Sequence, residues 1–395
     1  MKVAFVSLIC YDFRYKKEIR EHREEADYFD TKILASHPDP IHKWCKMLYI
    51  KNIDVEFWYL ACLSKTSKLF KHKYGHRLRR IPAHKIWLKY LNAEISIRLL
   101  KELKRQKITH VLVAPYLLNK YWLVDIFDIL VMFCKWLNIK IFPIYGGDSI
   151  LNYHWIKRKI KIFYLKQTTC ILCQSKAELD IMVKRFKFPH SKIIYFKNML
   201  DLENFTPIPR DECVNYLKLD PTQRYLLYVG RFTYAKGIHH LINVFPKLLK
   251  LKPNLQLLIV GWGPYRKELK KLIKYHGLEN KIWFKDFVPN EYLKYYYSLA
   301  DVFVLPSYTE GVPNVLMEAI ACNTVCIATN VGGIPDILKD GLGIIIPPKN
   351  EKALYDAIVH VLDNGFEINQ KRRKQLLYEI DLHHKADELE KILMR

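Results

Sequence analysis

Short apolar runs alternate with longer amphipathic segments along the whole chain, and this alternation restricts the fold more than any other feature. In the first half, the runs that read as buried strands are VAFVSLI (3–9), HVLVAPY (110–116), KIFPIYG (140–146) and CILCQS (170–175). Between them lie segments such as 93–107, whose apolar residues recur at helical spacing. Strands that alternate with helices predict a parallel, doubly wound sheet.

The second half repeats the same alternation after a turn-rich segment, 198–212, that reads as a linker. Its strand-like runs are 224–231, 254–263, 281–287, 301–307, 325–329 and 343–348. A length of 395 residues also favours two domains. We therefore expect an α/β protein with two Rossmann-like doubly wound domains facing across a cleft. The expected bounds are 1–200, 201–375 and a last helix, 376–395, that packs back toward the N-terminal domain.

The positive charge is concentrated in one half of the chain. The formal net charge is +24. Residues 1–200 hold 38 Lys and Arg against 17 Asp and Glu, whereas residues 201–395 hold 26 against 23. The excess predicts that the first half meets a polyanionic partner or an anionic membrane surface.

A basic tract at 65–90 interleaves Lys and Arg with Leu, Phe, Tyr, Ile and Trp. It fits a solvated helical face, an interfacial segment whose apolar side chains dip into a bilayer, or a surface that follows a nucleic-acid backbone. No run approaches the roughly 20 apolar residues that cross a bilayer, and the first residues lack the features of a signal peptide. We expect a cytoplasmic protein that is not integral to a membrane.

Glycine-containing loops follow the strands of the second half, at the edge where doubly wound sheets bind ligands. In GRFTYAKG (230–237), Gly230 permits a close turn, while Arg231 and Lys236 can reach a diphosphate. The loop GWGP places Gly261 at the end of the next strand. These two loops favour a site for a phosphorylated ligand.

A third loop, SYTEGVPN (307–314), leaves a strand and enters a helix near Pro313. The first amides of a helix lack internal partners, so those of Gly311, Val312 and Asn314 can face an oxygen-rich ligand. A fourth loop, VGGIPD (331–336), repeats the pattern of strand, glycine and helix. Glu310 and Glu318 lie eight positions apart around the third loop.

In this order the loops resemble the nucleotide-sugar-binding domain of the retaining glycosyltransferases of family 4, which have the GT-B architecture of two Rossmann domains. The resemblance covers roughly residues 198–350, including KIWFKDFVPNEYLKYYYSLADVFVLPSYTEGVPNVLMEAIA and VGGIPDIL. It implies an enzyme that needs no metal and no cofactor and whose donor substrate is a UDP-, GDP- or ADP-sugar.

The resemblance also assigns roles to individual residues. Arg231 and Lys236 would hold the donor diphosphate and stabilise the leaving group as its charge grows. Glu310 would accept hydrogen bonds from the transferred sugar, and Glu318 from the ribose hydroxyls. The expected donor-binding residues, beside the catalytic Arg231, Lys236 and Glu310, are Gly230, Gly261, Gly311, Val312, Pro313, Asn314 and Glu318.

The acceptor side departs from the family pattern. The loop after the first strand, SLICYDFRYKK, contains no glycine where a Gly-Gly pair is common. The segment FPIYGGDSIL resembles the family's H-G-x-D region, with Tyr145 where histidine is usual. The expected acceptor residues are Tyr145, Gly146, Gly147 and Asp148. His154, His239 and His240 are interpreted as ordinary helix histidines.

Together these features predict a retaining, metal-independent glycosyltransferase that acts on a hydroxyl acceptor. The expected acceptor is a lipid-linked or envelope glycan at the inner face of the membrane. Two alternatives stay open: a glycosyltransferase acting on nucleic acid, and a catalytically silent GT-B protein that binds membrane or nucleic acid through its basic half.

Overall fold

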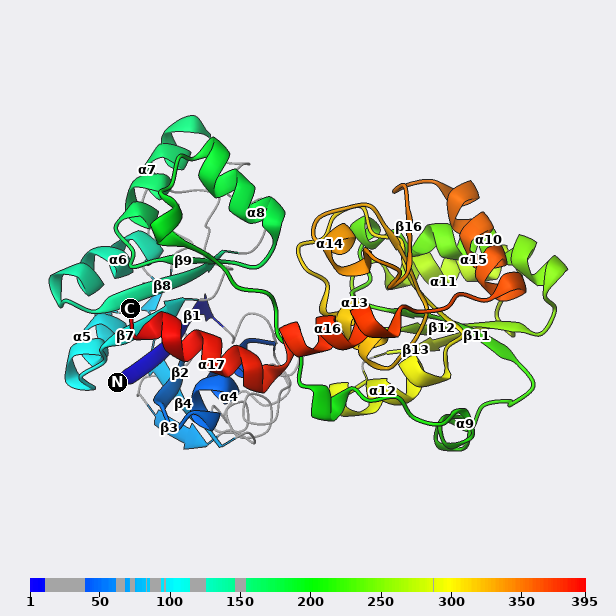
Figure 1. Ribbon diagram of the computed structural model, residues 1–395, viewed down its shortest axis with the longest axis horizontal. Coiled ribbons are helices and arrows are strands. Elements are labelled where there is room, and N and C mark those ends of the chain that lie inside the picture. The colour runs from blue at the N-terminus through cyan, green and yellow to red at the C-terminus, as the bar shows by residue number, and fades with distance from the viewer. Residues whose placement is uncertain are drawn as a thin grey trace. The chain divides into compact units, whose positions relative to one another are not determined.

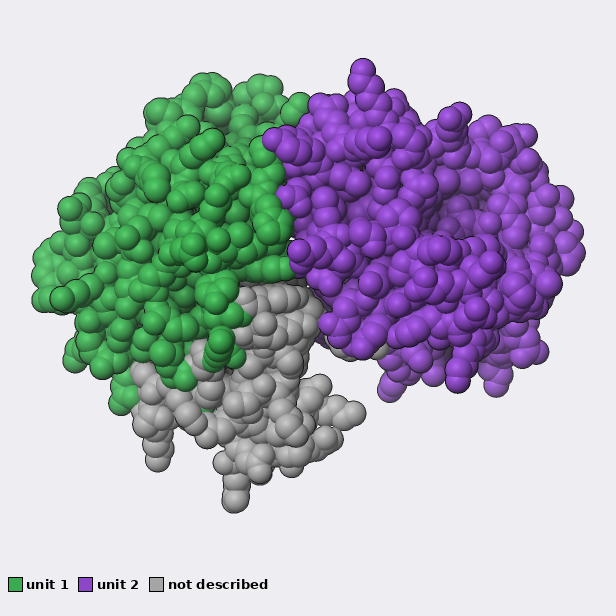
Figure 2. All heavy atoms as spheres, turned by 60° about the horizontal axis from the view of Figure 1, so that its bottom comes forward, with its two compact units in different colours: residues 1–197, 382–395 green, residues 198–381 purple. Residues whose placement is uncertain are grey.

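A computed structural model describes residues 1–10, 40–61, 68–71, 75–82, 84–85, 94–95, 97–113, 126–145, 154–286 and 288–395. The chain forms two compact units, coloured separately in Figure 2. Unit 1 comprises Met1–Lys197 and Leu382–Arg395, and unit 2 comprises Asn198–Asp381. Both are built on parallel sheets with Rossmann-like winding, which confirms the α/β class expected from the sequence.

Unit 1 contains an eight-stranded sheet in the order β10-β9-β8-β7-β1-β2-β4-β3, in which only the β3–β4 pair is antiparallel. Its strands are β1 (Lys2–Cys10), β2 (Asp54–Ala61), β3 (Lys68–Lys71), β4 (Arg77–Pro82), β7 (His110–Val113), β8 (Lys140–Tyr145), β9 (Ile171–Cys173) and β10 (Ile193–Tyr195). A separate antiparallel pair joins β5 (His84–Lys85) to β6 (Glu94–Ile95).

Helices cover both faces of this sheet because its strand residues are apolar on both sides. The helices of unit 1 are α4 (Pro40–Ile50), α5 (Ile97–Arg105), α6 (Ile126–Trp136), α7 (Trp155–Lys166), α8 (Lys176–Asp180), which continues as a π-helical turn over Ile181–Arg185, and α17 (Leu382–Leu393). Ala4 and Val6 of β1 belong to the core beneath α5 and α6. Phe5 between them meets Trp44 of α4 on the opposite face.

The last helix of the chain, α17, packs against α4 in unit 1 (Figure 1). Lys51 at the end of α4 forms ion pairs with Asp387 and Glu390 of α17. The ammonium group of Lys385, which is buried, lies 4.1 Å from the centroid of the Phe196 ring. These contacts make α17 an integral helix of unit 1.

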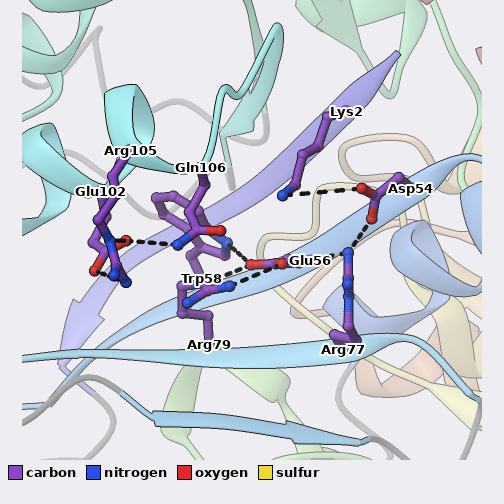
Figure 3. A network of polar contacts seen from close by, with 9 residues as sticks. All are labelled: Lys2, Asp54, Glu56, Trp58, Arg77, Arg79, Glu102, Arg105 and Gln106. Atoms are coloured by element: carbon purple, nitrogen blue, oxygen red, sulfur yellow. Dashed lines mark hydrogen bonds and ion pairs between the residues drawn. The ribbon is translucent and has the colours of Figure 1, made fainter.

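Part of the basic tract 65–90 forms strands and not a helix. Leu78 and Ile81 of β4 are fully buried, so they cannot dip into a bilayer. Arg79, also buried, donates two hydrogen bonds to Glu56 of β2, at 2.5 and 3.0 Å (Figure 3). Trp58 donates a third hydrogen bond, at 2.8 Å, to the same carboxylate. Residues 62–67, 72–74, 83 and 86–90 of the tract lie outside the described residues.

The arginine is tolerated inside the sheet because the neighbouring strand supplies its counter-charge. Burial alone would raise the pKa of Glu56, but the hydrogen bonds and charge of Arg79 lower it. The helical interpretation is therefore wrong for β3 and β4, which are strands, and the interfacial interpretation is wrong for the buried apolar side chains of β4. Neither interpretation included the Glu56 carboxylate as a partner of Arg79, because Glu56 lies 23 positions earlier in the sequence.

Unit 2 contains a six-stranded, wholly parallel sheet in the order β13-β12-β11-β14-β15-β16. Its strands are β11 (Arg224–Val229), β12 (Leu255–Val260), β13 (Ile282–Lys285), β14 (Val302–Leu305), β15 (Cys326–Thr329) and β16 (Ile344–Ile346). Numbered along the chain, this is the order 3-2-1-4-5-6 of the Rossmann fold.

The helices of unit 2 are α9 (Arg210–Leu217), α10 (Ile238–Leu251), α11 (Arg266–Tyr275), α12 (Asn290–Leu299), α13 (Asn314–Ala321), α14 (Ile334–Leu338), α15 (Glu351–Asn364) and α16 (Gln370–Ile380). Alternate residues of β11 face opposite cores. Tyr225 and Leu227 pack in the core with α12 and α13, whereas Leu226 and Tyr228 pack in the core with α10 and α15. Among the described residues of both units, no helix combines the length and the apolar character needed to span a bilayer.

The Glu56–Arg79 pair gives a test of how unit 1 is stabilised. Because removing one partner leaves a buried charge, Glu56→Leu should lower the free energy of unfolding by about 3–5 kcal/mol in urea titrations. The double variant Glu56→Leu/Arg79→Leu should lose less than the sum of the two single variants. As a control, Asp54→Ala removes the exposed carboxylate that pairs with Arg77 and should cost at most about 1 kcal/mol. Equal losses for Glu56→Leu and Asp54→Ala would contradict the assignment.

Candidate active site

The strand order of unit 2 reverses between β11 and β14, which lie side by side in the middle of the sheet. Ligands of doubly wound sheets bind at such a reversal, outside the carboxyl ends of the strands. The loop after β11 carries Arg231 and Lys236, and the loop after β14 carries Glu310. The fold therefore brings two of the sequence motifs to one edge of one sheet.

The side chains of Lys236 and Glu310 meet at this edge. Nζ of Lys236 donates a hydrogen bond to Oε1 of Glu310 at 2.7 Å. The hydroxyl of Ser307 donates to the same oxygen at 2.6 Å. The Glu310 side chain is only 8% exposed, whereas that of Lys236 is 27% exposed. The carboxylate is thus fixed by a cation and a hydroxyl, and the ammonium group keeps access to solvent.

The glycines of the loops let the loops touch one another. At Gly261 φ is +146°, and a Cβ there would lie 1.9 Å from the carbonyl oxygen of Gly230. At Gly332 φ is +55°, and a Cβ would lie 1.9 Å from the carbonyl oxygen of Glu310. The amide of Gly333 donates to the carbonyl of Gly311 at 2.7 Å. Gly261 and Gly332 are therefore required by contact between loops, before any ligand is considered.

Arg231 lies on the exposed side of the same edge. Its guanidinium carbon lies 5.5 Å from the centroid of the Trp262 ring, in the loop after β12. No described carboxylate forms an ion pair with Arg231. An exposed guanidinium held against an aromatic face keeps its donors available to an anion.

The third loop enters α13 without a capping side chain. Pro313 occupies the N-cap position, and its side chain accepts no hydrogen bond from the first turn. The side chain of Asn314 is held by Asn198, whose amide nitrogen donates to Oδ1 of Asn314 at 2.9 Å. Gly311 is exposed, and a Cβ there would meet no atom within 4 Å. The amide edge at the start of α13 is thus open beside Glu310.

Glu318 lies more than one helical turn after the start of α13 and is buried. The hydroxyl of Tyr297, from α12, donates to its Oε2 at 2.9 Å. Burial, together with the Glu318 charge, raises the pKa of Tyr297, so this tyrosine stays a donor. Glu318 is held in one orientation by a neighbouring helix.

His239 and His240 take part in a chain of hydrogen bonds that the sequence did not reveal. Nε2 of His239 lies 2.7 Å from the hydroxyl of Tyr308, which in turn lies 2.6 Å from Nε2 of His240. Nδ1 of His240 lies 2.7 Å from Oε1 of Glu351 on α15. With His240 donating to Glu351, its Nε2 accepts from Tyr308, and Tyr308 accepts from Nε2 of His239. The chain ties α10 and α15 to Tyr308, two residues before Glu310.

Burial and hydrogen bonding together set the charge states of the residues in this hydrogen-bond chain. Burial lowers the pKa of His239 to about 4, with a further contribution from His240, and raises the pKa of Tyr308 to about 12. Burial alone would raise the pKa of Glu351, but the hydrogen bond from His240 lowers it. Near neutral pH the chain therefore holds a neutral His239 and Tyr308 and an ionised Glu351.

The acceptor residues expected from the sequence lie in unit 1, at the end of β8. Tyr145 is the last residue of this strand and is buried, with its backbone paired to Cys173. Gly146, Gly147 and Asp148 lie outside the described residues. Across the part of the chain that the structure describes, no three His, Cys, Asp or Glu side chains gather as a metal site would require.

Solved structures with the same fold cover the whole chain. HepE of Anabaena in complex with UDP aligns with a TM-score of 0.74 over 100% of both chains, at 12% sequence identity. Sucrose-phosphate synthase of Thermosynechococcus elongatus aligns with a TM-score of 0.69 over 99% of this chain and 98% of its own, at 18% identity. At such low identity the likeness shows the fold, which is the GT-B fold of two Rossmann-like domains.

Sequence comparison identifies the second unit more narrowly. Residues 210–378 match the family model described as glycosyl transferases group 1. An uncharacterized glycosyltransferase of Methanocaldococcus jannaschii is 33% identical over 202 residues, which are 50% of this chain and 52% of that protein. The putative teichuronic acid biosynthesis glycosyltransferase TuaC of Bacillus subtilis is 35% identical over 220 residues, 55% of this chain and 54% of that protein.

Residues 210–378 therefore match the group 1 glycosyltransferase domain, which confirms the resemblance to glycosyltransferases seen in the sequence motifs. The assignment to family 4 stays a prediction. The chain spans about half the length of these two curated relatives.

The contact between Gly332 and Glu310 can be tested by paired substitutions. Gly332→Ala should lower the free energy of unfolding by about 1–3 kcal/mol, because alanine is strained at φ +55° and its Cβ would collide with the Glu310 carbonyl. Gly311→Ala should leave stability unchanged, since a Cβ there meets open space. Equal thermal or urea stability of the two variants would contradict the loop packing described above.

The lowered pKa of His239 predicts a pH dependence of stability. The unfolded histidine takes up a proton near pH 6.5, and the folded one only near pH 4. Stability is therefore fully present above about pH 6.5 and falls as the pH is lowered toward 4. The loss should be about 1–2 kcal/mol, because the partial exposure of the ring reduces the full effect. The variant His239→Gln should show a smaller decrease in urea titrations over this range, and an unchanged decrease would exclude His239 as its source.

Proposed function

We propose that the chain is a retaining, metal-independent glycosyltransferase that moves a sugar from a nucleotide-diphosphate sugar to a hydroxyl acceptor. The observation that carries this proposal is the 2.7 Å contact between Lys236 and Glu310. The bond that breaks in a nucleotide sugar joins the diphosphate to the anomeric carbon. Groups that hold the phosphate and the sugar must therefore lie next to each other, as this cation and this carboxylate do.

Lys236 and Arg231 act on the leaving group. As the anomeric C–O bond breaks, its electron pair and negative charge pass to the terminal phosphate of the nucleoside diphosphate. The exposed donors of Arg231 and the ammonium group of Lys236 stabilise that charge as it grows. The open amides at the start of α13 add a positive dipole on the same edge.

Glu310 orients the sugar and is not assigned as a nucleophile. Its Oε1 is occupied by Lys236 and Ser307, so Oε2 is the oxygen free of those two contacts and suited to sugar hydroxyls. In front-side attack the acceptor oxygen bonds to the anomeric carbon on the face that the phosphate leaves. The acceptor proton passes to the departing phosphate oxygen, which balances the reaction and retains the configuration.

Glu318 is proposed to bind the ribose hydroxyls, in an orientation to which the hydrogen bond from Tyr297 contributes. HepE of Anabaena has been solved in complex with UDP and with UDP-glucose. UDP-glucose is therefore the first donor to test, beside GDP- and ADP-sugars.

The proposed acceptor is a lipid-linked or envelope glycan at the inner face of the cytoplasmic membrane. Two considerations support it: the excess positive charge of residues 1–200, and relatives named for teichuronic acid and colanic acid biosynthesis in Bacillus subtilis and Escherichia coli. Tyr145, Gly146, Gly147 and Asp148 remain the proposed acceptor residues of unit 1.

Substitution of the site residues tests the assignment. Lys236→Ala and Glu310→Gln should each lower kcat by about 10²–10³, since each removes a group that acts on the developing charge or on the sugar. Turnover is measured as release of nucleoside diphosphate from a panel of donors, with and without cellular lipid extract. Lys252→Ala is the matched control, because it breaks an ion pair with Asp363 in the same unit and should leave kcat unchanged within about twofold.

Normal turnover in both site variants would overturn the assignment. Failure of the native protein to bind any nucleotide sugar by calorimetry would favour a silent GT-B protein. The anomeric configuration of the product, read by NMR, checks retention, and activity after chelation with EDTA checks independence from metal. Transfer to DNA or RNA in place of a lipid or glycan would favour the nucleic-acid acceptor.

A further inference from the structure

The outer face of helices α6 and α7 in unit 1 exposes large apolar side chains that a folded protein normally buries. The exposed fractions are 72% for Trp136, 59% for Phe163, 58% for Met132 and 53% for Trp155. Ile156 beside Trp155 is also exposed. Single exposed apolar residues are common on protein surfaces, but a cluster of this kind marks a place of contact.

These side chains lie on one continuous surface, which we call the α6–α7 face. On α7, Trp155, Lys159 and Phe163 follow at intervals of four residues and so form one stripe along the helix. On α6, Met132 and Trp136 are spaced in the same way. The two helices lie side by side (Figure 1).

Two contacts join the stripes. The hydroxyl of Tyr164 on α7 donates to Sδ of Met132 on α6 at 3.5 Å. Nζ of Lys135 donates to Oε1 of Gln167, just after α7, at 2.6 Å. The apolar side chains of the two helices therefore form one surface and not two separate spots.

The α6–α7 face is positively charged. Its exposed cations include Lys135, Lys159 and Lys166, and no described carboxylate forms an ion pair with any of them. The ammonium group of Lys159 lies 5.1 Å from the centroid of the Trp155 ring, so charge and aromatic surface are presented together. Helix α7 has the sequence WIKRKIKIFYLK, which contains five cationic residues and no acidic residue.

The single acidic residue of α6, Asp128, is fully buried and cannot neutralise this charge at the surface. Its Oδ2 receives a hydrogen bond from Nζ of Lys161 of α7 at 2.5 Å, and both side chains are 0% exposed. This internal pair also joins the two helices. The helix pair thus presents apolar groups and cations outward while its acidic group faces inward.

We propose that the α6–α7 face is the surface by which this protein binds an anionic lipid bilayer. Trp and Phe side chains suit the boundary between headgroups and acyl chains, and Lys side chains suit the anionic headgroups. A nucleic-acid duplex would attract the cations but has no unstacked base for Phe163 and no apolar partner for Met132. The inference deepens the proposed function, on which it rests for the membrane location of the acceptor.

Vesicle binding by the full chain tests the inference. The protein is sedimented with vesicles of phosphatidylcholine alone and with vesicles that also contain phosphatidylglycerol. It should bind the anionic vesicles, bind less at raised ionic strength, and show a blue shift of tryptophan emission on binding. Trp155→Ser/Phe163→Ser should weaken binding by about tenfold or more. Lys159→Gln/Lys166→Gln should weaken it by about fivefold for each cation removed.

A matched control lies on α11 of unit 2, which is also basic and ends in the exposed Tyr275. Tyr275→Ser/Lys274→Gln removes one aromatic ring and one charge elsewhere and should leave vesicle binding unchanged. Circular dichroism and thermal unfolding verify that all variants fold. Donor binding by calorimetry is measured separately, so a failure of the proposed enzymatic function and a failure of the membrane surface give different results.

Three outcomes would overturn the inference. The first is equal binding of the native protein and the Trp155→Ser/Phe163→Ser variant to anionic vesicles. The second is binding to single- or double-stranded nucleic acid but not to vesicles. The third is a stable dimer whose formation is abolished by the same substitutions, because the face would then meet a second copy of the chain.

Discussion

One carboxylate oxygen, Oε1 of Glu310, joins the two central loops of unit 2 through its contacts with Lys236 and Ser307. The surroundings of this oxygen are fixed from several directions. Gly332 packs against the carbonyl of Glu310, and Tyr308 is bound to α10 and α15 through His239 and His240. The role proposed for Glu310, to orient the transferred sugar, would require such support, because small displacements of catalytic groups are costly. The residues around Glu310 therefore serve its position as well as the stability of the unit.

Charged residues are distributed differently in the two units. Unit 2 is nearly neutral overall, and its charges act locally, at Arg231 and Lys236. Unit 1 carries the excess charge, but two of its cations are buried and neutralised: Arg79 pairs with Glu56, and Lys161 with Asp128. Three of its exposed cations, Lys135, Lys159 and Lys166, lie beside apolar side chains on the α6–α7 face. A buried pair of opposite charges leaves the net charge unchanged, so the net charge of a half-chain does not show which of its cations reach the surface.

The sequence predicted unit 2 more fully than unit 1, for a physical reason. Four strands of unit 2, β11, β12, β14 and β16, are short apolar runs followed directly by glycine or proline, so their ends are marked in the sequence itself. Arg79 of β4 is different, because its burial depends on a carboxylate 23 positions away. The hydrogen-bond chain of His239 has the same character, since its partners lie 69 and 111 positions along the chain. The apolar and cationic pattern of α7 is also visible in the sequence, but the longer basic tract at 65–90 was the segment predicted to contact a membrane.

The position of α17 in unit 1 has a consequence for how the protein is made. During synthesis the first 197 residues leave the ribosome without the helix that covers α4, and all of unit 2 is translated before that helix emerges. Unit 2 can therefore complete its core while unit 1 still exposes the surface around Phe196 that meets Lys385. Domains commonly fold from the N-terminus onward as they are synthesised. In this chain unit 1 receives its last helix only after all of unit 2 has been synthesised, so unit 1 is the later of the two to be completed.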